Sequence, residues 1–372
     1  MRCLLRGLFA SVCVSVAASA VTLMMGPVQT ARAVDPSTLP APTGDRSILP
    51  PDSRLELLFD GGCALTEGVA VAPDGMVYFS DITFTSLCKD EKKLYPQAGH
   101  IWKYDPGTRK ATVFRSPSGM SNGLKFDAEG NLIAALGADY GGRMLVKTDM
   151  KTGKSYILTG LFNGRPYNAL NDVSIDERGR IYFSDPRYLG HEPIEQAGYA
   201  VYRLDPDGKV HRVITNAGKN NGVLVSPDQR RLYVISNDNG WFDFQQLGPS
   251  EAPPTQGLHA LQVYDLDQAG NASNRKVLVN YADTAGGACS GPDGMVADVQ
   301  GNIYMALRCE HRPGIGVFTP DGKELAFIST GKELPTNVGF GRGADANLLY
   351  VTSGNSLYRI RMAKAGYQLP AR

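Results

Sequence analysis

Oxygen-donating side chains stand at the start of six similar segments of this 372-residue sequence: Glu67, Asn122, Asn171, Asn221, Asp293 and Asn337. Carboxylate and amide oxygens, without sulfur or imidazole, are the ligands that hard divalent cations prefer. We therefore expect one bound cation, Ca²⁺ in the first place, with Mg²⁺, Mn²⁺ or Zn²⁺ as alternatives. In the other interpretation each Asn-Gly pair is a simple turn. That interpretation fits Glu67 and Asp293 poorly, because an unpaired carboxylate in a narrow channel is costly.

The segments that follow these side chains are internal repeats. Each has small or apolar residues, a short polar turn and then an apolar-aromatic run, as in GVAVAPDGMVYFSD from Gly68 and DVSIDERGRIYFSD from Asp172. Each repeat predicts two antiparallel strands joined by a tight turn. A second hairpin follows most of them, so each unit predicts a four-stranded sheet. Six such sheets over about 310 residues predict an all-β fold, a six-bladed β-propeller, because one small unit cannot bury both of its faces alone.

The two ends of the repeat region predict how the propeller closes. The last repeat lacks a clear fourth strand, and the apolar stretch from Arg54 to Phe59 has no partner of its own. Pairing these two would close the ring with an N-terminal strand and leave no open sheet edge. We therefore expect a propeller domain over residues 54–372, preceded by a Pro- and Ser-rich linker at residues 34–53. The strand starts would then meet in the central channel.

The N-terminal 33 residues predict export. Arg2 and Arg6 precede an apolar stretch from Leu8 to Met25, and Ala31-Arg32-Ala33 offers a small-x-small cleavage site. This pattern is typical of a signal peptide, with a membrane anchor as the alternative. We expect a periplasmic or secreted protein that is released from the membrane after cleavage. We also expect it to be a monomer or a weak dimer. The chain has 38 Lys and Arg residues and 37 Asp and Glu residues, a net charge of +1. Such a balance gives no overall positive electrostatic field that would attract nucleic acid.

Removal of residues 1–33 leaves four cysteines, Cys63, Cys88, Cys289 and Cys309. On the strand map, Cys63 and Cys88 lie in neighbouring loops of the first blade, and Cys289 and Cys309 lie in the equivalent loops of the fifth. The sequence therefore predicts the disulfides Cys63–Cys88 and Cys289–Cys309, since any other pairing would join non-adjacent blades. Four reduced, buried thiols are the alternative.

The same map places the long loops on the face where the inner strands start, and such loops usually carry a binding site. Two of them contain candidate substrate contacts, Trp241 and His311, although loop packing and a surface position are the alternatives. Asn122 and Asn337 are further candidates for substrate binding. Asp81 and Asp185 end FSD motifs, and we expect them to cap loops.

Four short motifs occur in separate repeats: Thr66-Glu67-Gly68, Asn171-Asp172, Asn221-Gly222-Val223 followed by Ser226-Pro227-Asp228, and Gly291-Pro292-Asp293-Gly294-Met295. Together and in this order they resemble the family of gluconolactonases, senescence marker protein and luciferin-regenerating enzyme. The resemblance covers nearly the whole chain after residue 33. It implies a six-bladed propeller with one metal in the channel and lactone hydrolysis as the activity. By motif, Glu67, Asn221 and Asp293 correspond to metal ligands, and Asn171 to a ligand or a substrate contact.

Two positions depart from the family pattern. Val69 stands where Pro usually follows Glu-Gly, and Ala169 stands where sugar-lactone relatives have an Arg that contacts substrate hydroxyls. The second departure argues against gluconolactone itself, although not against lactones as a class. Related propellers that hydrolyse phosphotriesters use a similar ligand set, so the ligands alone do not choose the substrate.

The leading hypothesis is therefore an exported, metal-dependent lactonase in which the metal polarises the lactone carbonyl and Asp293 is the general base. A phosphotriester or aryl-ester hydrolase on the same site is one alternative. A non-enzymatic, ligand-binding propeller with a structural cation is the other.

Overall fold

The computed structural model describes residues 33–238, 257–281, 289 and 291–371. The segment predicted to be a signal peptide, apart from its last residue, and the candidate Trp241 lie outside these ranges. Within them the regular secondary structure is almost entirely β-strand, with short 3₁₀ turns at Pro36–Thr38 and Gly343–Asp345. None of the helices in these ranges is long and apolar enough to cross a membrane.

Six antiparallel sheets contain all of the strands in the described ranges except β11 and β12. The first sheet consists of β3 (Leu65–Val71), β4 (Val77–Ile82), β5 (His100–Asp105) and β6 (Lys110–Arg115). The second consists of β7 (Ser121–Phe126), β8 (Leu132–Leu136), β9 (Leu145–Thr148) and β10 (Ser155–Thr159). The third consists of β13 (Val173–Ile175), β14 (Ile181–Asp185), β15 (Ala200–Leu204) and β16 (Val210–Ile214). A small hairpin, β11 (Leu161–Phe162) and β12 (Arg165–Pro166), lies between the second and third sheets in the sequence.

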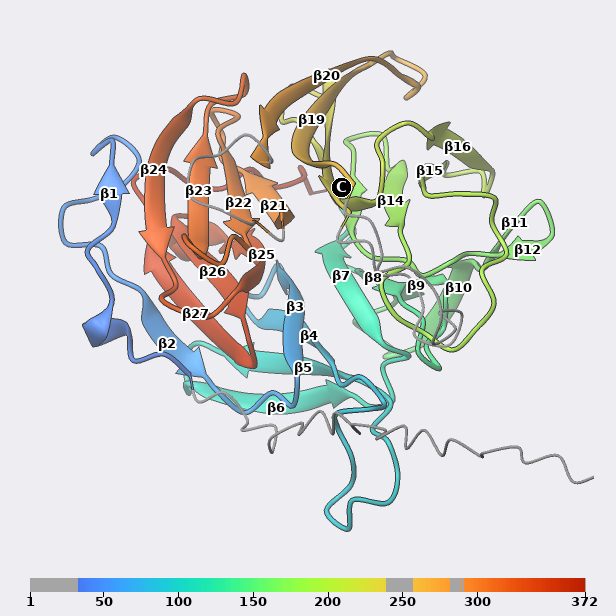
Figure 1. The fold of residues 1–372 in the computed structure, drawn as a ribbon, viewed down its shortest axis with the longest axis horizontal. Helices are drawn as coiled ribbons and strands as arrows, with labels where there is room; N and C mark the ends of the chain where they lie inside the picture. Colours follow the sequence, from blue (N-terminus) through green and yellow to red (C-terminus); the bar gives the residue numbers. More distant parts are fainter. Residues whose placement is uncertain (1–32, 239–256, 282–288, 290, 372) are drawn as a thin grey trace, which may run out of the picture. The chain divides into compact units, whose positions relative to one another are not determined.

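The other three sheets complete the set. The fourth sheet consists of β17 (Asn220–Val225), β18 (Arg231–Asn237), β19 (His259–Leu266) and β20 (Ala272–Asn280). The fifth contains β21 (Pro292–Ala297), β22 (Ile303–Leu307), β23 (Gly314–Phe318) and β24 (Glu324–Ser329). The sixth consists of β25 (Pro335–Phe340), β26 (Leu348–Ser353) and β27 (Ser356–Arg361) with β2 (Glu56–Phe59). The inner strands β3, β7, β13, β17, β21 and β25 contact one another in this order, and β25 returns to β3. The six-bladed propeller predicted from the repeats is confirmed (Figure 1).

The closing strand is also as predicted. β2 pairs with β27, with Leu57 opposite Tyr358, so the N-terminal strand completes the sixth blade. The segment expected to be a linker lies against the propeller as well: β1 (Thr43–Gly44) pairs with β24 and gives the fifth blade a fifth strand. The backbone of Thr43, Gly44 and Asp45 pairs with the exposed edge of β24, and this pairing could not be read from the Pro- and Ser-rich composition.

The core lies between neighbouring blades, and strand alternation explains why. Along β4, Phe79 packs with Tyr350 of the sixth blade, whereas Tyr78 points the other way and packs with Phe126 of the second. Residues i and i+1 of a strand face opposite sides of a sheet, so a fully apolar strand is buried on both faces. The blades therefore stabilise one another and hold the inner strands at fixed positions around the channel.

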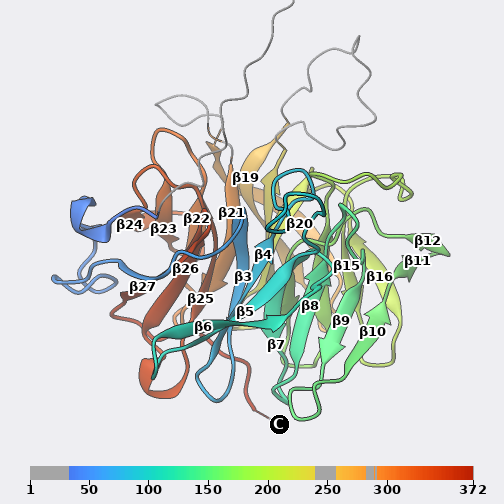
Figure 2. The ribbon, with the colours of Figure 1, turned by 90° about the horizontal axis from the view of Figure 1, so that it is seen from below.

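The described C-terminal residues cover one end of the channel. After β27, Tyr367 donates its backbone N–H to Ala297 and its hydroxyl to Glu177, at 3.0 and 2.7 Å. The Gln368 side chain donates to the carbonyl of Phe340. In Figure 2 the chain ends beside the short turns, on the face opposite the long loops. A ligand therefore reaches the channel from the face that carries the long loops.

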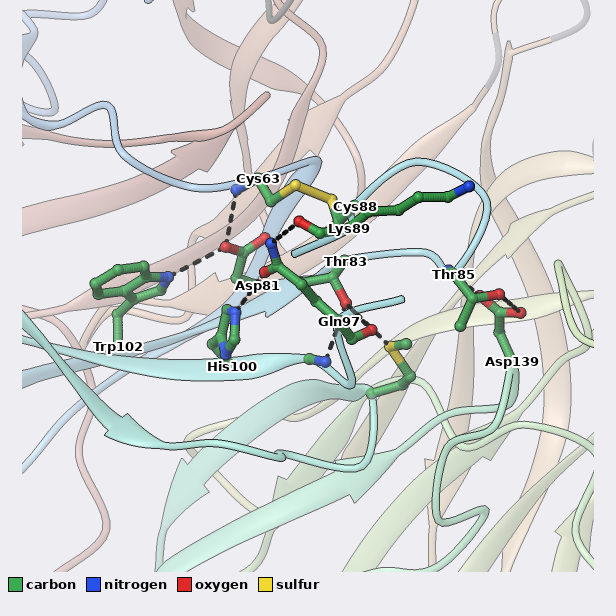
Figure 3. Close-up of a disulfide and its surroundings, with 12 residues drawn as sticks. Cys63, Asp81, Thr83, Thr85, Cys88, Lys89, Gln97, His100, Trp102 and Asp139 are labelled. Carbon is green, nitrogen blue, oxygen red and sulfur yellow. Dashed lines mark hydrogen bonds between the residues drawn. A yellow bond between two sulfur atoms is a disulfide. The ribbon is translucent and has the colours of Figure 1, made fainter. Parts of the chain in front are cut away.

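Both predicted disulfides are present in the structure, Cys63–Cys88 and Cys289–Cys309. The Cα atoms of the first pair are 6.0 Å apart. Figure 3 shows this bridge beside Asp81, which accepts hydrogen bonds from the backbone N–H of Cys63 and the indole N–H of Trp102. Each bridge lies between the segment that leads into an inner strand and the loop that leaves the second strand of the same blade.

Candidate functional site

The predicted ligands stand at irregularities of the inner strands. Pairing with the second strand shifts register after Glu67 in β3, between Asn220 and Val223 in β17, and between Pro292 and Met295 in β21. Such β-bulges re-aim a side chain, and here they occur where the side chains reach the channel. The Asn-Gly and Asp-Gly pairs therefore lie within strands, and the interpretation of these pairs as simple turns is wrong.

The glycines that follow Glu67, Asn122 and Asn221 are required by the approach of the next blade. A Cβ on Gly222 would lie 2.5 Å from the carbonyl oxygen of Asp293, and one on Gly123 would lie 2.7 Å from that of Asn171. No real Cβ tolerates such a contact with backbone. The ligand-Gly dipeptides thus set both the direction of the side chain and the spacing of neighbouring inner strands.

A cavity of about 610 Å³ lies where the inner strands begin, and five of the six predicted side chains line it: Glu67, Asn122, Asn171, Asn221 and Asp293. All five are buried. The sixth, Asn337, is not among the lining residues; its amide N–H donates to Glu67 Oε2 at 3.4 Å, and its Oδ1 accepts from the Val338 N–H. Asn337, expected to contact substrate, instead fixes the orientation of Glu67.

Two buried carboxylates, those of Glu67 and Asp293, share this cavity. Burial raises the pKa of Glu67 well above its ordinary range, and the charge of Asp293 raises it further. Burial also raises the pKa of Asp293, although the guanidinium of Arg308, 3.5 Å from Asp293 Oδ2, opposes this shift. Both carboxylates can ionise together only if a positive charge compensates them, and a divalent cation would supply such a charge.

The amide of Asn221 supplies a second observation in favour of a cation. Its Nδ2 donates to the Tyr188 hydroxyl at 3.2 Å, and that hydroxyl donates to the Asn237 carbonyl at 3.0 Å. Asn221 Oδ1 is buried and accepts no hydrogen bond from the described part of the chain. No cluster of three or more His, Cys, Asp or Glu in those residues could hold a metal, so the carboxylates need amide oxygens to complete a site. The residues present fit a hard cation.

Sequence analysis missed four of the polar residues that line the cavity: Asp139, which follows the second strand of the second blade, and Tyr188, Asn237 and Arg308. Tyr188 and Arg308 follow the second strands of the third and fifth blades, and Asn237 ends that of the fourth. Their shared position after a second strand is the only signal that could have identified them. Asn237 donates to the carbonyl of Pro292 and so braces the residue before Asp293.

The other candidates lie elsewhere. His311 is exposed in the loop after β22 and is not among the lining residues. Asp81 and Asp185 cap loops as expected: Asp185 accepts hydrogen bonds from the backbone N–H groups of Asn168 and Ala169, at 3.0 and 2.8 Å. These caps fix the segments that lead into β3 and toward Asn171.

Comparison with known proteins agrees with this geometry. The family model described as "SMP-30/Gluconolactonase/LRE-like region" matches residues 65–355, a span that contains every lining residue except Ala64. The chain belongs to this family. A gluconolactonase of Zymomonas mobilis, a member by name, is 31% identical over 266 residues, which cover 69% of this chain and 66% of that enzyme. The chain thus spans about two thirds of the length of that relative.

Solved structures of the family share the fold. A gluconolactonase of Xanthomonas campestris superimposes with a TM-score of 0.67 at 23% identity, covering 89% of this chain and 96% of that one. A calcium-binding protein, regucalcin, of Agrobacterium tumefaciens superimposes with a TM-score of 0.63 at 18% identity, covering 85% and 96%. At these identities the likeness shows the propeller, and the chemistry depends on the residues in the cavity.

Proposed function

We propose that this chain is a metal-dependent lactonase. The observation that carries the proposal is the pairing of two buried carboxylates, Glu67 and Asp293, with a buried amide oxygen of Asn221 that accepts no hydrogen bond from the described residues. The relatives named as gluconolactonases support lactones as the substrate class.

Glu67, Asn221 and Asp293 would hold the cation, and Asn171, which lines the same cavity, would complete the set or contact the substrate. When bound, the cation supplies a Lewis acid for the lactone carbonyl and for the oxyanion that forms from it. Ca²⁺ is our first choice, because the donors are carboxylate and amide oxygens and a regucalcin with the same fold is named as calcium-binding.

Asp293 is the proposed general base. It takes a proton from the water molecule whose oxygen attacks the lactone carbonyl carbon, and it returns that proton to the ring oxygen when the ring C–O bond breaks. The product is a hydroxy acid. Arg308 lies beside Asp293 Oδ2 and favours its ionised form, which is the form a base requires.

A substrate panel tests this function. Sugar lactones, alkyl lactones, aryl esters and paraoxon are each assayed with Ca²⁺, Mn²⁺ and Zn²⁺, and turnover of lactones above the other classes is expected. Preference for paraoxon or aryl esters would support the alternative hydrolase. Shifts in melting temperature without turnover of any compound would support the binding propeller. Asp293→Asn should abolish turnover, and full activity of this variant with metal bound would contradict the base assignment.

We also propose export to the periplasm or medium, with residues 1–33 removed. Two disulfides support it, because such bonds persist in oxidising compartments. N-terminal sequencing of protein from the periplasmic fraction should start at Val34. Recovery of the full-length chain in the cytoplasm or the membrane would contradict the proposal.

A further inference from the structure

The cavity has two chemically different sides. Tyr188, Asn237 and Arg308 lie on one side, from the third to the fifth blades. On the other side, the residue two positions before each ligand or ligand-like side chain is apolar: Leu65 before Glu67, Met120 before Asn122, and Ala169 before Asn171. All three apolar residues line the cavity. These three side chains form an apolar wall next to the polar ring.

The last residue of β4, Ile82, and two residues of the loop after it, Phe84 and Leu87, extend this wall and also line the cavity. Leu87 is 52% exposed, so this end of the wall is open to solvent. Asp139 also lines this side, but its carboxylate is engaged: it accepts from the Thr85 N–H at 2.7 Å and from the Thr85 hydroxyl at 2.9 Å, and it pairs with His191 at 2.9 Å.

The Phe84 turn is built to stay in place. Phe84 has φ of 42°, a conformation that bulky residues rarely adopt and that persists only where the surroundings enforce it. Its carbonyl accepts the N–H groups of Leu87 and Cys88, at 2.8 and 3.1 Å. The Cys63–Cys88 disulfide fixes one side of the turn and the Thr85–Asp139 hydrogen bonds fix the other (Figure 3). An apolar surface held in this way is preorganised to receive a ligand.

From this arrangement we infer that the substrate is a lactone with an apolar alkyl or aryl substituent, packed against Phe84, Leu87 and Met120. The inference rests on the proposed lactonase function and names its substrate class. Hydroxyl groups of a sugar lactone against this wall would lose water without gaining partners, which is costly. An alkyl chain there gains the free energy of leaving water, while the lactone carbonyl faces the ring of carboxylates and amides.

Three lactones with the same six-membered ring test the inference: δ-valerolactone, which has no substituent, δ-decalactone, which carries a pentyl chain, and D-glucono-δ-lactone. We expect kcat/KM for δ-decalactone to exceed that for δ-valerolactone by roughly 10-fold or more. D-Glucono-δ-lactone should be the poorest of the three. An equal or higher kcat/KM for D-glucono-δ-lactone would overturn the substrate class and leave the lactonase function standing.

If none of the three lactones is hydrolysed, that result counts against the lactonase function alone. A binding experiment then still decides the inference about the apolar substituent. The δ-lactam with the same pentyl chain cannot open readily and is titrated into the protein by calorimetry beside the unsubstituted δ-lactam. The pentyl lactam should bind at least roughly 10-fold more tightly, with a negative heat-capacity change. Equal affinities would overturn the inference.

Substitution of the wall provides the matched control. Leu87→Ala should lower kcat/KM for δ-decalactone by about 5-fold more than kcat/KM for δ-valerolactone, since the pentyl chain is the part of the substrate proposed to contact this side chain. Leu161→Ala serves as the control, because Leu161 is 55% exposed and lies in the β11–β12 hairpin, outside the cavity lining. It should change neither substrate. An equal loss for both lactones in Leu87→Ala would contradict the contact.

Discussion

The Asn221 amide is oriented by the Tyr188 hydroxyl, which lies 3.2 Å from its nitrogen and leaves its oxygen without a hydrogen bond from the described residues. A side-chain amide has one oxygen and one NH₂ group, so a partner for the nitrogen also decides where the oxygen points. In the proposed cation site, Tyr188 would thus orient Asn221 as a ligand without contributing a ligand atom of its own.

Removal of this hydroxyl should weaken metal binding. In Tyr188→Phe the Asn221 amide loses the group that fixes its orientation, and we expect Ca²⁺ affinity to fall by roughly 10-fold, as for other groups that orient ligands. Titration calorimetry measures it. Tyr199→Phe is the control: both rings lie near Lys219 Nζ, at 4.6 Å for Tyr188 and 5.7 Å for Tyr199, so that contact is shared. Equal losses in both variants would argue against the orienting role.

Metal binding should release protons. Burial raises the pKa of both Glu67 and Asp293, so protons compete with the cation for these carboxylates as pH falls. Ca²⁺ affinity should therefore rise between pH 5 and pH 8. Calorimetry in buffers with different ionisation enthalpies counts the protons released. An affinity that does not depend on pH, with no proton release, would mean that the cation binds elsewhere.

Asp185 should make stability depend on pH. Burial raises its pKa from 3.8 to about 7, against the opposing hydrogen bonds from Asn168 and Ala169. Between these two values the unfolded chain loses the proton that the folded chain keeps, so stability is highest at low pH and falls as pH rises. The slope should be about 1 kcal/mol per pH unit from this residue.

Denaturant unfolding at several pH values between 4 and 7 tests this slope. Asp185→Asn, which stays neutral, should remove the contribution and flatten the profile. Asp321→Asn, at a side chain that is 83% exposed, should leave the profile as it is. A profile that is equally steep in wild type and Asp185→Asn would contradict the assignment.

The first disulfide should affect both stability and the apolar wall. Cys63–Cys88 closes a loop with a sequence separation of 25, and removing it with two Cys→Ser changes should cost about 3 kcal/mol of unfolding free energy. Because the bridge also holds the Phe84 turn, kcat/KM for δ-decalactone should fall more than that for δ-valerolactone. The same changes at Cys289 and Cys309, with a separation of 20, should give a similar loss of stability without this discrimination. Equal effects of both bridges on both substrates would contradict the link to the turn.

The features that the sequence predicted correctly rest on repeated or local patterns. Six copies of one hairpin pattern predict the blades, and the position of each cysteine on that pattern predicts its partner. The convergence of Glu67, Asn221 and Asp293 follows from the same map, because every inner strand starts at the channel.

The features that the sequence analysis missed depend on single contacts between residues far apart in the chain. Asn337 reaches Glu67 across 270 positions, and its neighbours in the sequence do not indicate whether it faces the cavity or a carboxylate. Tyr188 and Arg308 lie in irregular loops, where no period reveals the direction of a side chain. The C-terminal residues that cover the channel bind largely through backbone carbonyls, which any sequence offers.

The most direct test of the central claim is to remove the metal and then return it. At each stage the hydrolysis of a δ-lactone is measured by the protons that it releases. Protein treated with a chelator and then dialysed should lose lactonase activity, and added Ca²⁺ should restore it, whereas Glu67→Gln should stay inactive at the same Ca²⁺ concentration. Full activity of the chelated protein, or of Glu67→Gln, would contradict a cation held by Glu67, Asn221 and Asp293 as the centre of catalysis.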